Sequence, residues 1–465
     1  MHLVQSRSAM KVRDQHETGR QVTGAKARKR NTTNTKFAPT LPGGTTYKAL
    51  QAAYRAIPAT TGRPGDFSFT RGGVLSVELL TTFLLYTVAD GNRYGMRHLL
   101  QSFWEDACDQ GIDLPRAQPV SASAICQARQ RLPGGLFRDL LSVLATQVTD
   151  TGSASRWRGR RVYAADGALV NVKSSPELDD EFGVAKNCYT PQVRLSVLVD
   201  VMSRMPVNYA AGGRSEVGER EQLFAMLPSL RQGDLLLLDR GYPSYEVLAK
   251  CAKEQIDFIV RCPTSQTFKF IDGFKASGAT STVIAVDLEQ CDTEEAPKTR
   301  LRLVRCNGPA GPVIYITSLT ASEATAEEIF DLYHLRWEVE EFFKLATSEY
   351  AGQKQFRSTS ALGVHQEIGA LVLYLAMTRV LACEAEGLVD KKDGQFVSQK
   401  GAVLALHRHL IGLLLDDDPM RIQARIRRAV ERLQRTLDRR RPSRSYRRVS
   451  KKPRRKWGPR GKTRA

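Results

Sequence analysis

Three acidic residues stand where carboxylates could form one chemical site. Asp166 lies in the strand-like segment VYAADGALVNV (162–172), Asp239 ends the four-leucine run of DLLLLDRGY (234–242), and Glu340 lies in a strongly helical stretch. The carboxyl ends of strands in α/β sheets are the usual place for ligands, and carboxylates are the groups that hard cations such as Mg²⁺ prefer. Each acid alone also has an ordinary explanation, as a turn residue or as a solvated helix charge.

The segment around Glu340 predicts a helix over Ala324–Ser348 with two separate faces. One face combines polar and charged side chains at steps of three and four residues: Tyr333, Arg336, Glu340, Lys344 and Thr347. A second stripe, displaced by about 120°, is apolar: Ile329, Leu332, Leu335, Val339, Phe342 and Ala346. The regularity of the polar face favours a function for it, with a salt-bridged surface helix as the alternative.

These residues resemble the insertion-sequence-four-like bacterial transposases, a family with a ribonuclease-H-like fold and a DDE triad. The resemblance rests on YHLRWEVEEFFK (333–344), preceded in order by YAADG and LLLLDRGY, and it runs over about residues 70–450. The family signature is Tyr, two residues, Arg, three residues, Glu, six residues, Lys. Three of its members are matched here: Tyr333, Arg336 and Glu340. The final Lys falls on Thr347, whereas Lys344 lies one turn earlier on the same face.

The resemblance implies catalysis with two divalent ions, Mg²⁺ or Mn²⁺. In that arrangement Asp166 bridges both ions, Asp239 holds one and Glu340 holds the other, which suits in-line displacement at phosphorus. It also implies three DNA-binding residues. Arg336 would grip a phosphate, Tyr333 would contact the backbone of the terminal nucleotide, and Lys344 would supply a point charge to a phosphate.

The implied function is DNA transposition by a homodimer. Such a protein binds double-stranded DNA at the inverted-repeat ends of a mobile element, cleaves it and joins the 3′-hydroxyl ends to target DNA. Better-known relatives carry a Trp in their β insertion that accepts a flipped base. Here the four Trp residues lie elsewhere, and Phe268, Phe270 or Phe274 could stack instead, which leaves hairpin formation open. A nuclease without strand transfer and a decayed or repurposed DNA-binding protein are the alternative functions.

The order of the apolar segments predicts an α/β fold, since strands alternate with helices. With the resemblance, we expect a ribonuclease-H-like mixed sheet core with an inserted β-rich subdomain, preceded by an all-helical N-terminal domain and followed by helices and a basic tail. The predicted parts are a disordered basic leader (1–45), a helical DNA-binding domain (46–155), the first part of the catalytic core (156–262), the β-rich insertion (263–320), the second part of the core (321–390), a C-terminal helical region (391–438) and a disordered basic tail (439–465).

The same patterns predict the individual elements. Strands are expected over five segments: 162–172, 193–201, 206–211, 234–239 and 257–262. Helices are expected over 74–89, 93–109, 121–131, 216–230, 244–255, 363–385 and within 400–440. Segment 263–320 is expected to hold antiparallel strands and no helix. Residues 93–131 could form a helix-turn-helix, with a plain helical bundle as the alternative.

The net charge of +20 is concentrated at the two ends of the chain. Residues 439–465 hold fourteen Lys and Arg and no acid, and residues 1–36 hold nine against two acids, so residues 37–438 are close to neutral. Basic ends of this kind favour a polyanionic partner because they neutralise phosphates. A tail that only keeps the protein in solution is the alternative.

Other classes of protein fit the sequence poorly. The eight cysteines include no Cys-x-x-Cys pair, which predicts free thiols in a reducing cytoplasm rather than a zinc site or disulfides. The polar first thirty residues predict no secretory signal. The apolar runs Val74–Ala89 and Ile368–Cys383 fall short of the ~20 residues of a spanning helix. We therefore expect a soluble bacterial protein of the cytoplasm with no membrane partner, associated with the nucleoid when it binds DNA.

Overall fold

The computed structural model describes most of the chain between residues 74 and 439. The described ranges are 74–90, 94–150, 156–185, 188–214, 216–263, 268–288, 298–308, 311–346, 356–389 and 395–439. The predicted basic leader, all but the first residue of the predicted basic tail, and Thr347 lie outside the described residues.

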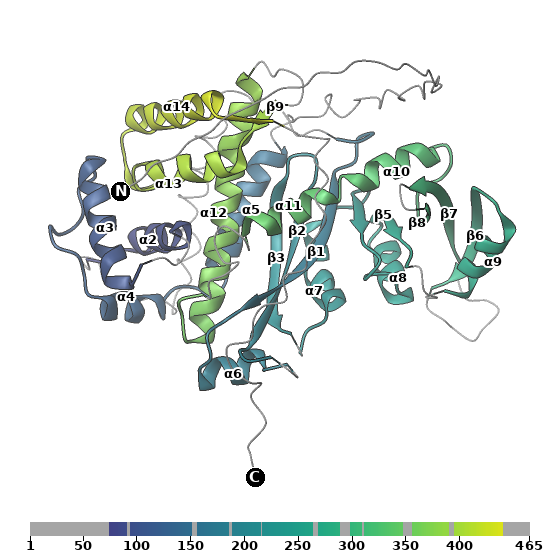
Figure 1. Ribbon diagram of the computed structural model, residues 1–465, viewed down its shortest axis with the longest axis horizontal. Helices are drawn as coiled ribbons and strands as arrows, with labels where there is room; N and C mark the ends of the chain where they lie inside the picture. Colours follow the sequence, from purple (N-terminus) through teal and green to yellow (C-terminus); the bar gives the residue numbers. More distant parts are fainter. Residues whose placement is uncertain are drawn as a thin grey trace, which may run out of the picture. The chain divides into compact units, whose positions relative to one another are not determined.

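An eight-stranded mixed sheet forms the centre of the fold, in the order β3-β2-β1-β4-β5-β8-β7-β6 (Figure 1). Its first three strands are antiparallel neighbours: β1 (Val162–Asn171), β2 (Gln192–Asp200) and β3 (Met205–Gly213). The next two, β4 (Leu235–Leu238) and β5 (Asp257–Arg261), run parallel to β1. All five predicted strands are therefore confirmed, and so is the mixed α/β class.

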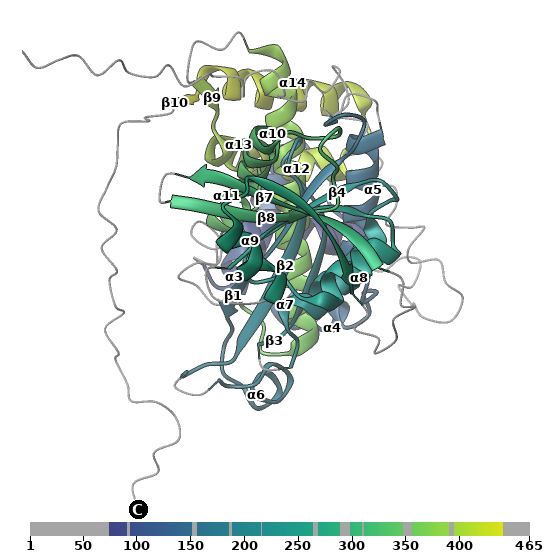
Figure 2. The same ribbon diagram turned by 90° about the vertical axis from the view of Figure 1, so that its right-hand side faces the viewer.

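The segment between the second Asp and the Glu continues this same sheet. Its strands are β6 (Ser281–Asp287), β7 (Lys298–Gly308) and β8 (Gly311–Thr317). They are antiparallel, as predicted, and β8 joins β5 through three residue pairs. Figure 2 shows the neighbouring strands β7 and β8. They extend the central sheet instead of building a second one.

The expectation of no helix in this segment was wrong, because residues 269–277 form α9 (Lys269–Ser277). Ile271 and Phe274 are three residues apart, and both are buried on one face of the helix. Gly278 ends the helix in the left-handed conformation, with φ +69°, which glycine adopts without a Cβ penalty. In FKFIDGF the apolar residues alternate as in a strand, but the three-residue spacing of the two buried side chains is that of a helix, and the helix forms.

Helices cover both faces of the sheet, because alternate side chains of the central strands point to opposite sides. On one side Tyr163 and Ala165 share a core with α7 (Glu219–Met226) and α8 (Tyr245–Lys253). On the other side Val162 and Ala164 share a core with the helices that flank the sheet. These are α5 (Leu136–Asp150), α10 (Ala326–His334), α11 (Trp337–Lys344) and α12 (Ala361–Leu388).

Helix α12 is the central support of the helical part of the fold. It packs against α2 (Val77–Ala89), α5, α13 (Gln399–Leu415), α14 (Pro419–Arg435) and strand β3 (Figure 1). By length and composition it could cross a membrane, but its most apolar stretch is fully buried among these elements. The prediction of a buried helix at Ile368–Cys383 is thereby confirmed.

The N-terminal helices share the core of α12. Besides α2 they comprise α3 (Met96–Asp109) and α4 (Ala122–Arg129). A short acidic helix, α6 (Pro176–Phe182), follows β1, and β9 (Gln395–Val397) pairs with β10 (Leu437–Arg439) near the end of the described chain. The division into domains and the DNA-binding role of residues 46–155 stay predictions.

Gly369 of α12 allows a close approach that should be sensitive to one added methyl group. A Cβ there would lie 2.5 Å from the Tyr209 hydroxyl and 2.6 Å from Cβ of Phe137. We expect Gly369→Ala to lower the free energy of unfolding by about 1–3 kcal/mol, the usual cost of overpacking a core. Urea unfolding measures it. Gly273→Ala in α9, where no atom lies within 4 Å, is the matched control and should be neutral or stabilising.

Candidate active site

Asp166 and Asp239 belong to neighbouring segments of the sheet, Asp166 on β1 and Asp239 just after the parallel strand β4. The ladder between β1 and β4 ends with Ala164 opposite Leu237. Continued by two residues, this register would set Asp166 level with Asp239, and the charge of Asp239 does act on Asp166. Asp239 directly follows the last residue of β4, as the sequence predicts, and its Oδ1 accepts the N–H of Gly241 at 2.7 Å.

Strand β1 continues through Asp166, so the alternative explanation of this acid as a turn residue is wrong. The antiparallel ladder with β2 pairs Asp166 with Val197 and Gly167 with Ser196, and it continues to Asn171. Asp166 is thus a mid-strand residue at the level where the neighbouring strand β4 ends. The glycine that follows serves a close approach, since a Cβ at Gly167 would lie 3.0 Å from the Ser196 hydroxyl.

The predicted long helix is two helices, α10 and α11, separated by Leu335 and Arg336. At this break the backbone bonds span three residues, with Arg336 N–H donating to the Tyr333 carbonyl at 3.0 Å and Val339 N–H to the Arg336 carbonyl at 3.1 Å. The tightened turn coincides with the point where the Arg336 side chain is tied to β1. Glu340 accordingly lies in the first turn of α11, not in the middle of a long helix.

Arg336 connects the acid on the strand with the acid on the helix. Its Nη1 donates to Oδ2 of Asp166 at 3.0 Å, and its Nη2 donates to Oε1 of Glu340 at 2.5 Å. Only 9% of the arginine side chain is exposed, against 23% for Asp166 and 35% for Glu340. The buried guanidinium of Arg336 thus binds the carboxylates of both Asp166 and Glu340 with its single positive charge.

The pKa of Asp166 depends on its burial and on the charged groups around it. Burial raises the pKa of Asp166 above its ordinary range, and the charge of Asp239 acts in the same direction. The N–H of Gly167, 2.8 Å from Oδ1 of Asp166, and the Arg336 guanidinium act in the opposite direction. A positive charge beside Asp166 therefore favours its ionised form.

Tyr333 lies behind Arg336 and is buried. The Arg336 guanidinium carbon is 5.8 Å from the centre of the Tyr333 ring, and that ring is 4.8 Å from the ring of Tyr315 in β8. Burial raises the pKa of Tyr333 to about 12. Tyr333 therefore supports Arg336 in this structure, and its predicted contact with a DNA backbone stays a prediction.

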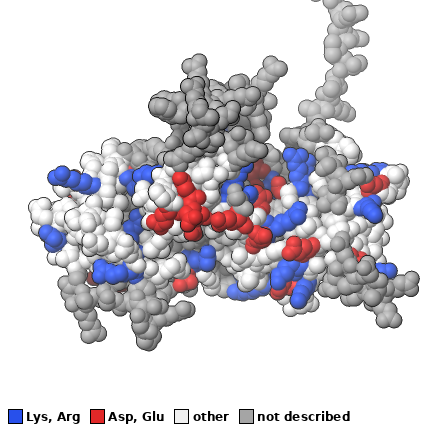
Figure 3. Space-filling model, turned by 90° about the horizontal axis from the view of Figure 1, so that it is seen from below, with Lys and Arg blue, Asp and Glu red and all other residues white. Residues whose placement is uncertain are grey.

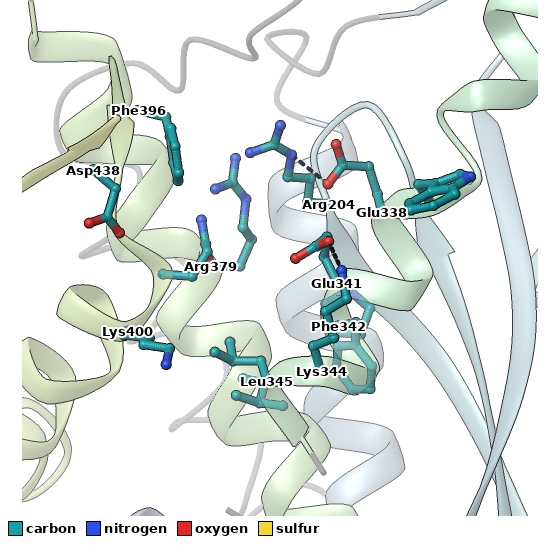
Figure 4. Close-up of a pocket in the computed structure, with 14 residues that line it drawn as sticks. Arg204, Glu338, Glu341, Phe342, Lys344, Leu345, Arg379, Phe396, Lys400 and Asp438 are labelled. Carbon is teal, nitrogen blue, oxygen red and sulfur yellow. Dashed lines mark hydrogen bonds and ion pairs between the residues drawn. The ribbon is translucent and has the colours of Figure 1, made fainter. Parts of the chain in front are cut away.

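Lys344, the last residue of α11, is the third residue predicted to bind DNA. Its ammonium pairs with Glu341, and both line a cavity of about 680 Å³. Figure 4 shows this cavity, with Lys344 joined to Glu341 and Arg204 joined to Glu338. Its role with DNA stays a prediction.

Sequence reasoning missed three residues that lie around the two aspartates. Glu219 begins α7 and forms an ion pair with Arg194 of β2. Tyr242 follows Asp239 by three residues and is fully buried, and its hydroxyl has no hydrogen-bond partner among the described residues. Burial and the charges of Asp166, Glu219 and Asp239 raise the pKa of Tyr242 well above its ordinary value, so the hydroxyl stays protonated. Among these three residues, only Tyr242 lies in a segment that the sequence marks as important, the DRGY run that begins with Asp239.

The donor chemistry of the site fits a hard divalent ion. Its side-chain donors are carboxylate oxygens, which Mg²⁺ and Mn²⁺ prefer over His or Cys ligands. In the described part of the chain, no three acidic, His or Cys side chains form a ready-made metal cluster. The cation that faces Asp166 and Glu340 here is the guanidinium of Arg336.

Comparisons with known proteins find similarity to transposases. Residues 157–377 match the family model described as the transposase DDE domain. The chain is 24% identical over 281 residues to the transposase InsG for insertion sequence element IS4 of Escherichia coli (strain K12). That alignment covers 58% of this chain and 63% of the relative, so it spans less than two thirds of the relative's length. Among solved structures, the piggyBac transposase synaptic complex with hairpin DNA aligns at a TM-score of 0.42 and 10% identity, over 85% of this chain and 84% of that chain.

Proposed function

We propose that the chain is a DDE transposase, on the support of the family match over residues 157–377, and that it binds the inverted-repeat ends of a mobile element, cleaves them and joins their 3′-hydroxyl ends to target DNA. One observation carries this proposal. Asp166 on β1 is joined to Glu340 through the Arg336 guanidinium, and Asp239, which directly follows the neighbouring strand β4, is close enough for its charge to act on Asp166. These are the acids that the family resemblance assigns to the triad.

The proposal includes a ribonuclease-H-like core. Its support is the strand order β3-β2-β1-β4-β5, in which three antiparallel strands are followed by two strands parallel to β1. Such a core sets one acid on β1 beside another after β4. The helix that carries the third acid packs on the same side of the sheet as α12.

In the proposed mechanism Asp166, Asp239 and Glu340 would hold two divalent ions, Mg²⁺ or Mn²⁺. Bound there, such ions activate the attacking oxygen and stabilise the leaving oxygen at phosphorus. Arg336, whose five donors suit phosphate, would hold a DNA phosphate next to the acids. Tyr333 would keep the guanidinium in place from behind.

The proposed partner is double-stranded DNA, bound by a homodimer in the bacterial cytoplasm. Seen from below, one face of the protein shows a compact group of acidic side chains, with Lys and Arg side chains spread around it (Figure 3). DNA carries one phosphate charge per ~1.7 Å of helix axis, so cations must lie between it and an acidic surface. Divalent ions and the basic ends of the chain would supply them.

The decisive test uses a plasmid that carries the two ends of the element, identified as short inverted repeats on either side of the coding sequence. We expect cleavage at both ends with Mg²⁺ or Mn²⁺, joined products when target DNA is added, and neither after chelation with EDTA, because the acids need a cation to approach a phosphate. Gel electrophoresis separates the products. Cleavage without joining would indicate the nuclease alternative, and metal-independent binding without cleavage would indicate a repurposed DNA-binding protein.

Deletion of residues 440–465, which leaves strand β10 intact, should weaken DNA binding by at least about tenfold at ~0.1 M salt. The physical reason is the loss of cations that release counterions from DNA. Fluorescence anisotropy at several salt concentrations measures it, and the plot of log K against log salt should become flatter. A full-length variant with Gln at every Lys and Arg of this segment should behave like the deletion. An unchanged slope in both would contradict a role for the tail.

A further inference from the structure

Glu219 extends its carboxylate over the two glycines that follow the candidate metal-binding aspartates. A Cβ at Gly167 would lie 3.6 Å from Oε1 of Glu219, and a Cβ at Gly241 would lie 3.8 Å from Oε2. The same position at Gly241 is 3.1 Å from Oδ1 of Asp239. Oxygens of Glu219 and Asp239 therefore lie within 4 Å of a common point.

Three contacts from α7 to β2 hold Glu219 in this position. Its Oε1 forms an ion pair with Nη1 of Arg194. One turn later, Gln222 accepts from the Ser196 hydroxyl at 2.5 Å and donates to the Arg194 carbonyl at 3.0 Å. Since Ser196 is the β-ladder partner of Gly167, α7 is fastened to the sheet at the level of Asp166. The Glu219 side chain remains 37% exposed, so a ligand can reach it.

The Tyr242 hydroxyl is a second, independent sign of a ligand at this place. The side chain is fully buried, and its hydroxyl has no hydrogen-bond partner in the described chain. A buried polar group without a partner gives up its hydrogen bonds to water and gains none in return, which is unfavourable. The carboxylates whose charges act on this hydroxyl are those of Asp166, Glu219 and Asp239. Its proton is thus available to an oxygen bound among these acids.

We propose that Glu219 is a fourth carboxylate of the metal site and a ligand of the divalent ion that Asp239 holds, and that the Tyr242 hydroxyl donates a hydrogen bond to a water of the same ion. This inference rests on the proposed function, because it adds a ligand to the same site. Carboxylate and water oxygens are the donors that Mg²⁺ and Mn²⁺ take. Arg194 is the positioning residue, since its ion pair fixes the Glu219 side chain.

The alternative is that Glu219 only serves as an ion-pair partner of Arg194. Metal binding separates the two possibilities without any measurement of cleavage. Isothermal titration calorimetry with Mn²⁺ alone, on the full-length protein without DNA, gives the number of ions and their affinities. We expect Glu219→Gln to raise the Kd of one ion by at least about tenfold, or about 1.4 kcal/mol.

Three further variants make this test specific. Glu219→Asp keeps the charge and should recover part of the Mn²⁺ affinity. Tyr242→Phe should raise the same Kd a few-fold while the melting temperature holds or rises, because the unpartnered hydroxyl is removed. Glu216→Gln is the matched control, since this exposed acid lies in the same segment, and it should bind Mn²⁺ like the wild type.

Each outcome decides for or against the proposal. Unchanged Mn²⁺ binding in Glu219→Gln overturns it, whether or not the melting temperature falls. If Glu219→Gln does not fold, Glu219→Asp and Tyr242→Phe give the answer, and wild-type binding in both overturns it. Asp239→Asn is measured in parallel. Wild-type Mn²⁺ binding in Asp239→Asn would mean that the proposed metal site itself is wrong, independently of Glu219.

Discussion

Replacement of Asp239 by asparagine is expected to reduce Mg²⁺-dependent cleavage of element-end DNA by at least about 10³-fold while the protein remains folded. The substitution removes the negative charge that attracts a divalent ion. It keeps an oxygen that can still accept the N–H of Gly241, now bound by Asp239 Oδ1 at 2.7 Å. The melting temperature should therefore change little, and the initial rate of strand cleavage on a labelled DNA end measures the effect.

The matched control is Asp234→Asn, at the opposite end of the same strand. Oδ2 of Asp234 accepts the N–H of Arg231 at 2.8 Å, in the same manner in which Asp239 accepts that of Gly241. This variant loses an equal charge five residues from Asp239, and it should cleave DNA like the wild type. Near-normal cleavage by Asp239→Asn would remove Asp239 from the site.

Replacement of Arg336 by alanine is expected to move metal binding and cleavage in opposite directions. Without the guanidinium, the carboxylates of Asp166 and Glu340 lose the cation that they share. Mn²⁺ should then bind about tenfold more tightly, because it no longer meets the positive charge of Arg336. Two nearby unit charges at an effective ε of about 20 interact by a few kcal/mol. Cleavage should fall roughly 10²-fold, the usual loss when a phosphate-stabilising donor is removed. Calorimetry with Mn²⁺ and single-turnover cleavage measure the two effects.

The control for this variant is Arg204→Ala. Arg204 also pairs with a glutamate of α11, since its Nε lies 2.9 Å from Oε2 of Glu338. This pair lies at the cavity in Figure 4 and does not include Asp166 or Glu340, so neither Mn²⁺ affinity nor cleavage should change. A folded Arg336→Ala protein with equal or weaker Mn²⁺ affinity would contradict the shared-cation account.

The parts of the site that depend on local pattern could be predicted from the sequence. Four leucines in a row require burial on both faces of a sheet, which sets Asp239 at the edge where β4 ends. The four-residue spacing of Arg336 and Glu340 predicts neighbours on one helix face, and the two side chains are hydrogen-bonded. Both inferences need only the period of a strand or a helix.

The parts that depend on packing could not be predicted. Leu335 and Arg336 are good helix formers, and nothing local marks the break between α10 and α11, where Arg336 is tied to Asp166 on β1. Likewise, Glu219 reads as an ordinary acid at the start of a helix. Its position over Gly167 and Gly241 results from the packing of α7 on the sheet. The spacing of residues in the sequence does not predict that packing.

The central position of α12 has a consequence for the order in which the protein is built. Chains fold from the N-terminus as they leave the ribosome, yet α2, α5 and β3 all bury side chains against a helix that ends at Leu388. The early helices and the sheet edge therefore keep apolar surface exposed until most of the chain has been synthesised. Arg336 and Glu340 emerge shortly before this helix, so the acids meet only in a nearly complete polypeptide. A translation product that ends before α12 would contain Asp166 and Asp239 but would lack the helix against which the surrounding elements pack.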